Sequence, residues 1–202
     1  MSDRGQTFTL EAFVAAILLV ATVAFALQAV TITSNTASVG DTEIRNQHAG
    51  LAEGVLDEAV ADGSLRTTLL YWSESPGQFH NAGEDGHYDS RIPPTPEGTA
   101  FGDSLERAFG DRQVRYNVDL YYRNAAGERE LQRLVESGTP GDDAVRVVET
   151  VTLYDNSSLV DESGTPRETT VADVEEQFYA PNVDEESPLY NVVRVEVVLW
   201  KT

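Results

Sequence analysis

The longest hydrophobic pattern in the chain is a run close to its N-terminus. Residues 12–32 are 21 consecutive positions without a charged side chain, AFVAAILLVATVAFALQAVTI. As a helix this run would extend about 31 Å at roughly 1.5 Å per residue, which matches the hydrocarbon core of a bilayer. The pattern therefore predicts one transmembrane helix.

Helical spacing returns after the small, polar residues 34–40, which indicate a break. Asp41 is a suitable N-cap, and Gly63 stands where a helix would end. Between them, apolar residues recur four or seven positions apart: Ile44, Leu51, Val55 and Ala59. This spacing predicts an amphipathic helix over residues 41–62.

The next two segments are less periodic. Residues 65–72, LRTTLLYW, fit either a further helical turn or a strand, because short apolar runs do not distinguish the two. Residues 73–99 are dense in Gly, Pro, Ser and acidic side chains and predict a long surface loop.

The second half of the chain alternates between apolar and polar positions, as half-buried strands require. Alternate residues are apolar throughout residues 114–122 and 193–199, and at positions 145, 147, 151 and 153 of a third segment. Residues 124–127 suit a hairpin connection into residues 128–135. The predicted fold is α+β, with an antiparallel sheet of about four strands packed on the helix.

Composition narrows the classes of function. The 202 residues include 34 acidic and 14 basic side chains, for a net charge of -20, with Lys201 as the single lysine. No sequence window contains a basic stripe, so we expect no nucleic-acid partner. The absence of cysteine excludes thiolate chemistry and disulfides. Dense carboxylates with almost no lysine indicate a halophilic source, because high salt screens their repulsion.

Charges flanking the apolar run predict its orientation. Arg4 precedes the run, whereas Asp41 and Glu43 follow it, so the positive-inside rule places the N-terminus in the cytoplasm and the later residues outside the cell. A secretory signal peptide cut near residues 36–38 is the alternative, although its apolar region is usually shorter. We expect a single-pass protein of the cell membrane.

The residues just before the run, Arg4-Gly5-Gln6-Thr7-Phe8-Thr9-Leu10-Glu11, resemble an archaeal class III signal peptide. In that family of type IV pilin-like precursors, a prepilin-type peptidase cuts before the hydrophobic helix, which remains in the mature protein. The resemblance implies cleavage between Gly5 and Gln6. It also implies a pilin-like fold, in which a long N-terminal helix precedes an antiparallel head.

Glu11 departs from the family pattern by one position. The family carries glutamate at the fifth mature residue, whereas cleavage after Gly5 makes Glu11 the sixth. A cut after Gln6, a variant spacing and no processing therefore remain open. Glu11 itself has two interpretations: it marks the membrane interface near the helix N-terminus, or it pairs with the new ammonium of Gln6 on a neighbouring subunit.

These observations predict four parts. Residues 1–5 form a leader peptide, residues 6–33 the transmembrane and assembly helix, residues 34–40 a linker, and residues 41–202 an acidic extracytoplasmic domain.

Gly102-Asp103-Ser104-Leu105 spells the signature of a GDSL-type serine hydrolase. That chemistry requires a histidine base, which the family supplies after the serine. All three histidines, at positions 48, 80 and 87, precede Ser104. We instead interpret Asp103 or Ser104 as the cap of a short helix, and expect no enzymatic activity.

Two further patterns involve candidate ligands or modification. One loop contains five candidate ligands, His80, Glu84, Asp85, His87 and Asp89, but no zinc or EF-hand spacing fits them, so we expect no metal site. No phosphate-binding glycine loop or nucleotide fingerprint is present. We therefore also expect no cofactor and no small-molecule substrate. Asn156-Ser157-Ser158 is a glycosylation sequon after a predicted strand.

The sequence thus predicts a structural subunit or accessory component of a type IV pilus-like surface structure, with other pilin-like subunits and a prepilin-type peptidase as partners. The alternative is a membrane-anchored extracellular binding domain that forms no filaments.

Overall fold

The computed structural model describes residues 14–20, 22, 42–89, 100–110 and 114–201. The chain divides into two compact units, residues 1–44 and 45–202. In the first unit, residues 14–20 and 22 are helical. Within the described residues, no helix combines the length and the apolar character needed to cross a membrane.

The second unit combines short helices with three antiparallel sheets. A helix over residues 42–61 leads into it. The elements that follow are α2 (Ser64–Leu69), β1 (Trp72–Ser73), β2 (Gln78–Phe79), α3 (Ala100–Phe109), β3 (Val114–Arg123), β4 (Arg129–Val135), β5 (Val145–Tyr154), β6 (Ser158–Val160), β7 (Pro166–Thr170), the 3-10 helix η1 (Ala172–Gln177) and β8 (Leu189–Lys201).

The largest sheet has four antiparallel strands in the order β4-β3-β8-β5. Val197 of β8 lies opposite Val118 of β3 and Val147 of β5. These three valines belong to the inner face, where alternate residues of the central strands are buried. Because each fully buried Val or Leu side chain contributes about 1.5–3 kcal/mol, this face supplies much of the driving force for folding.

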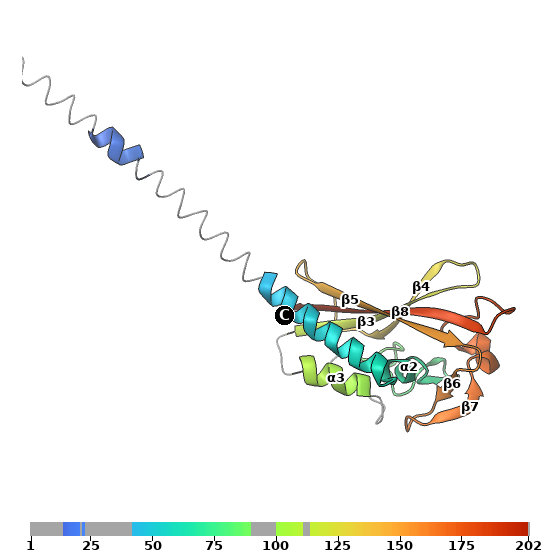
Figure 1. The fold of residues 1–202 in the computed structure, drawn as a ribbon. Helices are drawn as coiled ribbons and strands as arrows, with labels where there is room; N and C mark the ends of the chain where they lie inside the picture. The colour runs from blue at the N-terminus through green and yellow to red at the C-terminus, as the bar shows by residue number, and fades with distance from the viewer. Residues whose placement is uncertain (1–13, 21, 23–41, 90–99, 111–113, 202) are drawn as a thin grey trace, which may run out of the picture. The chain divides into compact units, whose positions relative to one another are not determined.

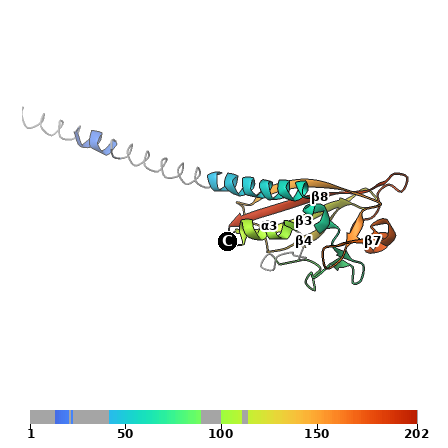
Figure 2. The same cartoon turned by 60° about the horizontal axis from the view of Figure 1, so that its bottom comes forward.

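Two helices cover the inner face, as Figures 1 and 2 show. The helix over residues 42–61 contributes Ala52, Val55, Leu56 and Ala59 to the core. Helix α3 contributes Phe101, Leu105 and Phe109. The predicted α+β arrangement of a helix against a four-stranded antiparallel sheet is therefore confirmed.

Several predicted boundaries are also confirmed. The helix predicted over residues 41–62 is observed over residues 42–61. Gly63 follows it with a positive φ of 78°, a conformation that suits glycine. The turn at residues 124–127 connects β3 to β4, and the Asn124 side chain accepts hydrogen bonds from the backbone N–H groups of Ala126 and Glu128. The ambiguous residues 65–72 belong mainly to α2 and then begin β1.

The predicted surface loop over residues 73–99 is wrong in its described part. Residues 72–79 contain the β1–β2 hairpin, and Phe79 and Tyr88 are buried. Trp72 packs edge-on against Phe79 and Tyr179, with ring centroids 5.0 and 5.3 Å apart. The contact with Tyr179 is non-local, so the Gly-rich and Pro-rich composition did not reveal it. The β6–β7 hairpin was likewise not predicted.

A crossover segment, residues 136–144, joins the two edge strands β4 and β5. It passes from one edge of the sheet to the other, and two hydrogen bonds with the Asn117 side chain place it on the outer face. The Asn117 side chain accepts from the Ser137 N–H at 2.7 Å and donates to the Gly138 carbonyl at 3.0 Å. At this end of β8, the outward residues Val198 and Trp200 are buried.

Candidate functional site

The residues that the sequence assigns to processing and assembly, Gly5, Gln6 and Glu11, lie outside the described residues, as does most of the 12–32 run. The described residues of that run, 14–20 and 22, are helical and exposed. Their large apolar side chains retain 50 to 68% of their accessible surface: Val14, Ile17, Leu18, Leu19 and Val20. An exposed apolar helix is suited to contact lipid or other apolar helices.

Ser104 is the fifth residue of α3. It is buried, and its hydroxyl accepts a hydrogen bond from Arg107 at 2.9 Å. The interpretation of Asp103 or Ser104 as the helix cap is therefore wrong, because α3 begins at Ala100 and both residues are already helical. The hydroxyl instead packs within the helix and orients an arginine.

The histidines of the acidic loop point to different partners. His80 lies 3.8 Å from the Glu162 carboxylate, whereas His87 lies 3.3 Å from that of Glu136. Glu162 follows β6, whereas Glu136 follows β4. In the described ranges, no group of three or more histidine or acidic side chains is arranged to hold a metal ion.

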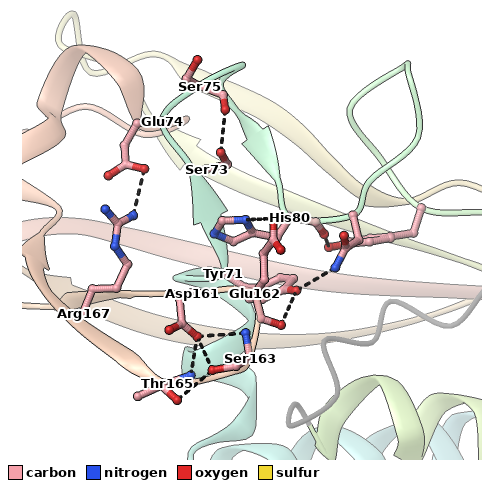
Figure 3. Close-up of polar contacts among 12 residues, drawn as sticks. Tyr71, Ser73, Glu74, Ser75, His80, Asp161, Glu162, Ser163, Thr165 and Arg167 are labelled. Atoms are coloured by element: carbon pink, nitrogen blue, oxygen red, sulfur yellow. Dashed lines mark hydrogen bonds and ion pairs between the residues drawn. The ribbon is translucent and has the colours of Figure 1, made fainter.

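Figure 3 shows the polar contacts around Tyr71 and His80. The Tyr71 hydroxyl donates to the Glu162 carbonyl at 3.1 Å and accepts from the Asn81 amide at 3.0 Å. The His80 ring packs on Tyr71 with centroids 4.8 Å apart. These contacts join residues 71–81 to the β6–β7 turn, and burial raises the pKa of Tyr71.

Carboxylates around this cluster are satisfied by the protein itself. Asp161 Oδ1 accepts from the Ser163 hydroxyl and N–H and from the Thr165 N–H, and these bonds lower the Asp161 pKa. Arg167 donates to Glu74 at 2.9 Å, which lowers the Glu74 pKa. Most of these polar groups thus bind one another, and the cluster fastens two hairpins together.

Asn156 is exposed in the turn after β5. The predicted position of the sequon in a surface turn is therefore confirmed, and an attached glycan remains a prediction.

A second cluster lies on the outer face of the four-stranded sheet. Outward positions of its strands carry six arginines, which we call the arginine face: Arg115, Arg123, Arg129, Arg133, Arg146 and Arg194. Only two acidic side chains, Asp119 and Glu196, occupy outward positions of these strands, and they lie opposite each other on β3 and β8. Because side chains alternate along a strand, all four strands present their arginines on one side of the sheet.

Ion pairs balance the charges at the centre of this face. The Glu196 side chain is only 10% exposed and contacts Arg146 at 3.7 Å and Arg194 at 3.1 Å. Asp119 Oδ1 is buried and has no hydrogen-bond partner among the described residues. Burial raises the Asp119 pKa, and nearby Arg133 partly offsets that rise while Glu196 adds to it.

One end of the arginine face forms a cavity of about 270 Å³. We call it the arginine hollow, and its lining residues are Tyr121, Tyr122, Arg123, Arg129, Val192 and Arg194. The Arg129 guanidinium lies 3.7 Å from the centre of the Tyr121 ring, and Arg123 donates to the Gly127 carbonyl at 2.7 Å. Neither arginine has a carboxylate partner among the described residues. Guanidinium groups in this arrangement are suited to bind a carboxylate or another oxyanion.

Sequence reasoning missed this site. In continuous windows of the sequence, the excess of acidic residues hides the arginines. The signal was present in the alternation itself, since Arg115, Arg123, Arg146 and Arg194 each fall on the polar side of a predicted strand. Only the strand order shows that these polar sides adjoin.

Comparison with curated proteins and with solved structures found no match. A family model matches residues 4–199, which include both the apolar run and the sheet. The chain therefore belongs to a family of unknown function, DUF7288.

Proposed function

We propose that this chain is a pilin-like structural subunit or accessory component of a type IV pilus-like cell-surface structure. The observation that carries the proposal is the exposed apolar helix at residues 14–20, which directly follows the processing-type motif. The family match begins at residue 4, so it covers the run and the α+β domain together. That combination supports a subunit whose helix drives assembly and whose domain faces solvent.

The proposal includes a location and a set of partners. The precursor is a single-pass membrane protein with its N-terminus in the cytoplasm and its acidic domain outside the cell, suited to a halophilic environment. A prepilin-type peptidase removes residues 1–5, and the helix then packs with other pilin-like subunits. The protein has no catalytic role in this proposal, and the helical setting of Ser104 supports that part.

The first test is the mature N-terminus, measured by mass spectrometry of protein from intact cells. We expect Gln6 as the first residue. Gly5→Phe should block processing, because a bulky side chain then occupies the position before the scissile bond. Ser2→Phe, which adds the same bulk away from that bond, should be processed normally. A wild-type protein that retains residues 1–5 would contradict the proposed maturation.

The second test measures the fraction of protein in sheared surface filaments relative to membranes. If Glu11 pairs with the ammonium of a neighbouring Gln6, Glu11→Gln leaves that charge unmatched in dry surroundings and should reduce incorporation. Glu43→Gln makes the same chemical change beyond the run and should not. Equal incorporation of both variants would leave Glu11 as an interface marker.

The arginine hollow favours a second candidate, a membrane-anchored binding domain that forms no filaments. Its three arginines could hold an acidic ligand without any contact between apolar helices. Absence of the wild-type protein from every filament preparation, together with an uncut N-terminus, would favour this second function.

A further inference from the structure

The charge of the arginine face is opposite to that of the chain. The protein carries a net charge of -20, yet this face has six arginines against two carboxylates. The two carboxylates lie at its centre, where Arg146 and Arg194 contact Glu196. Arg123 and Arg129 at the hollow have no such partner among the described residues, so their charges are available to another molecule.

Exposed apolar side chains accompany these arginines. Val192 lines the hollow, Leu131 lies opposite Tyr121 on the edge strand β4, and Val148 lies opposite Glu196 on β5. Each retains between 37 and 43% of its accessible surface. Arginine and aromatic side chains next to apolar ones are the composition of protein interfaces. This face is therefore better suited to a folded partner than to a small anion.

The helix over residues 42–61 has a complementary surface. Away from the core it exposes Glu53, Asp57 and Glu58. Gly50 and Gly54 are exposed on the same helix, and a Cβ atom added at either would meet no described atom within 4 Å. Glycine inside a helix costs about 1 kcal/mol relative to alanine, and packing against the described residues does not require it here. A neighbouring molecule that approaches the helix closely would require it.

We propose that the arginine hollow binds the Glu53–Asp57–Glu58 surface of a second copy of this chain. Two hollows would repel each other, and so would two acidic helices, so like faces do not pair. The contact must join unlike faces, and such heterologous contacts propagate into rings or filaments. The inference rests on the proposed function only where it places this contact in a filament.

A protein carboxylate fits the face better than a nucleic acid does. Asp119 and Glu196 interrupt the arginines at the centre of the sheet, where a phosphate backbone would need continuous positive charge. Long-range repulsion between two acidic copies is screened at high salt, with a Debye length of about 3 Å at 1 M. Contacts between arginine and carboxylate at hydrogen-bond distance persist under such screening, and salt strengthens the apolar part.

The test uses the full chain in detergent micelles and measures self-association by sedimentation in a salt series. Arg123→Glu with Arg129→Glu should weaken self-association by roughly tenfold or more, because the hollow then repels the helix. Glu53→Arg with Asp57→Arg should have the same effect. Mixing the two double variants should restore association, since each reversed face then meets its complement. Arg66→Glu with Arg107→Glu alters charge away from both faces and should change little.

Disulfide cross-linking tests the same contact if a charge-reversal variant folds poorly. The chain has no cysteine, so Val192→Cys and Asp57→Cys each introduce a single thiol. Oxidation of a mixture should link unlike variants, and neither variant should link to itself. The proposal would be overturned if the double variants associated as strongly as the wild type, or if mixing them as folded proteins failed to restore association. Cross-links between identical variants would also overturn it. Binding of a short DNA duplex that requires Arg123 and Arg129, without self-association, would also overturn it.

Discussion

Asn117 provides a direct test of how the crossover segment is held on the sheet. The buried amide accepts one hydrogen bond from Ser137 and donates one to Gly138. Asn117→Ala removes both bonds and leaves a backbone donor and acceptor without partners. A buried hydrogen bond contributes about 0.5–1.5 kcal/mol, and an unsatisfied group costs about 1–3 kcal/mol. We therefore expect a loss of about 2 kcal/mol in the free energy of unfolding.

The assay is urea unfolding of the full chain at constant high salt, followed by circular dichroism and tryptophan fluorescence. With a slope of about 2 kcal/mol per molar urea, the loss lowers the midpoint by about 1 M. Trp200 is buried on the face that the segment crosses, so its emission should also shift to longer wavelength if the segment detaches.

Two further variants make this prediction specific. Asn117→Asp keeps the acceptor for Ser137 but places a carboxylate against the Gly138 carbonyl. This variant should be less stable than Asn117→Ala at neutral pH, and it should recover as acid protonates the new carboxyl. Thr139→Ala truncates an exposed residue of the same segment and should not move the midpoint. An unchanged midpoint in Asn117→Ala would refute the reasoning.

Three other predictions follow from the charges and the helix surface. The raised Asp119 pKa means that stability is greatest below the pKa of the unfolded chain and declines as pH rises through the folded value; Asp119→Asn should therefore stabilise the protein at neutral pH by about 1 kcal/mol and have little effect in acid. The lowered Glu74 pKa gives the opposite pH dependence, so its contribution to stability is present above the pKa of the unfolded chain and is lost as pH falls through the folded value. Arg167→Gln should therefore lower the free energy of unfolding by at most about 1 kcal/mol at neutral pH, because the ion pair is partly exposed, and should have little effect in acid. Gly54→Ala should raise the free energy of unfolding by about 1 kcal/mol and weaken self-association. Stronger self-association together with higher stability would argue against close approach of a second copy at this helix. Urea unfolding over a pH series measures the stability of the Asp119→Asn and Arg167→Gln variants. For Gly54→Ala, urea unfolding measures stability and sedimentation measures self-association.

Local pattern in the sequence determined the main elements of this fold. Spacing near 3.6 residues placed the first helix of the domain, and alternation placed β3, β5 and β8, because these periods record which side of each element is buried. Turn residues at 124–127 identified the β3–β4 hairpin. The antiparallel sheet on a helix followed from the need to bury both apolar faces together.

Only the tertiary structure decided which elements adjoin when they are distant in sequence. Strand order is set by contacts between distant segments, and periodicity carries no information about it. The aromatic packing of Trp72 on Tyr179 is one result, and it orders a segment whose composition predicts a loop. The arginine face is another, because Arg129 and Arg194 are distant in sequence but line one hollow once β4, β3 and β8 pair. Sequence alone therefore determined which side of β3, β5 and β8 is polar, whereas strand pairing brought those sides together as a surface.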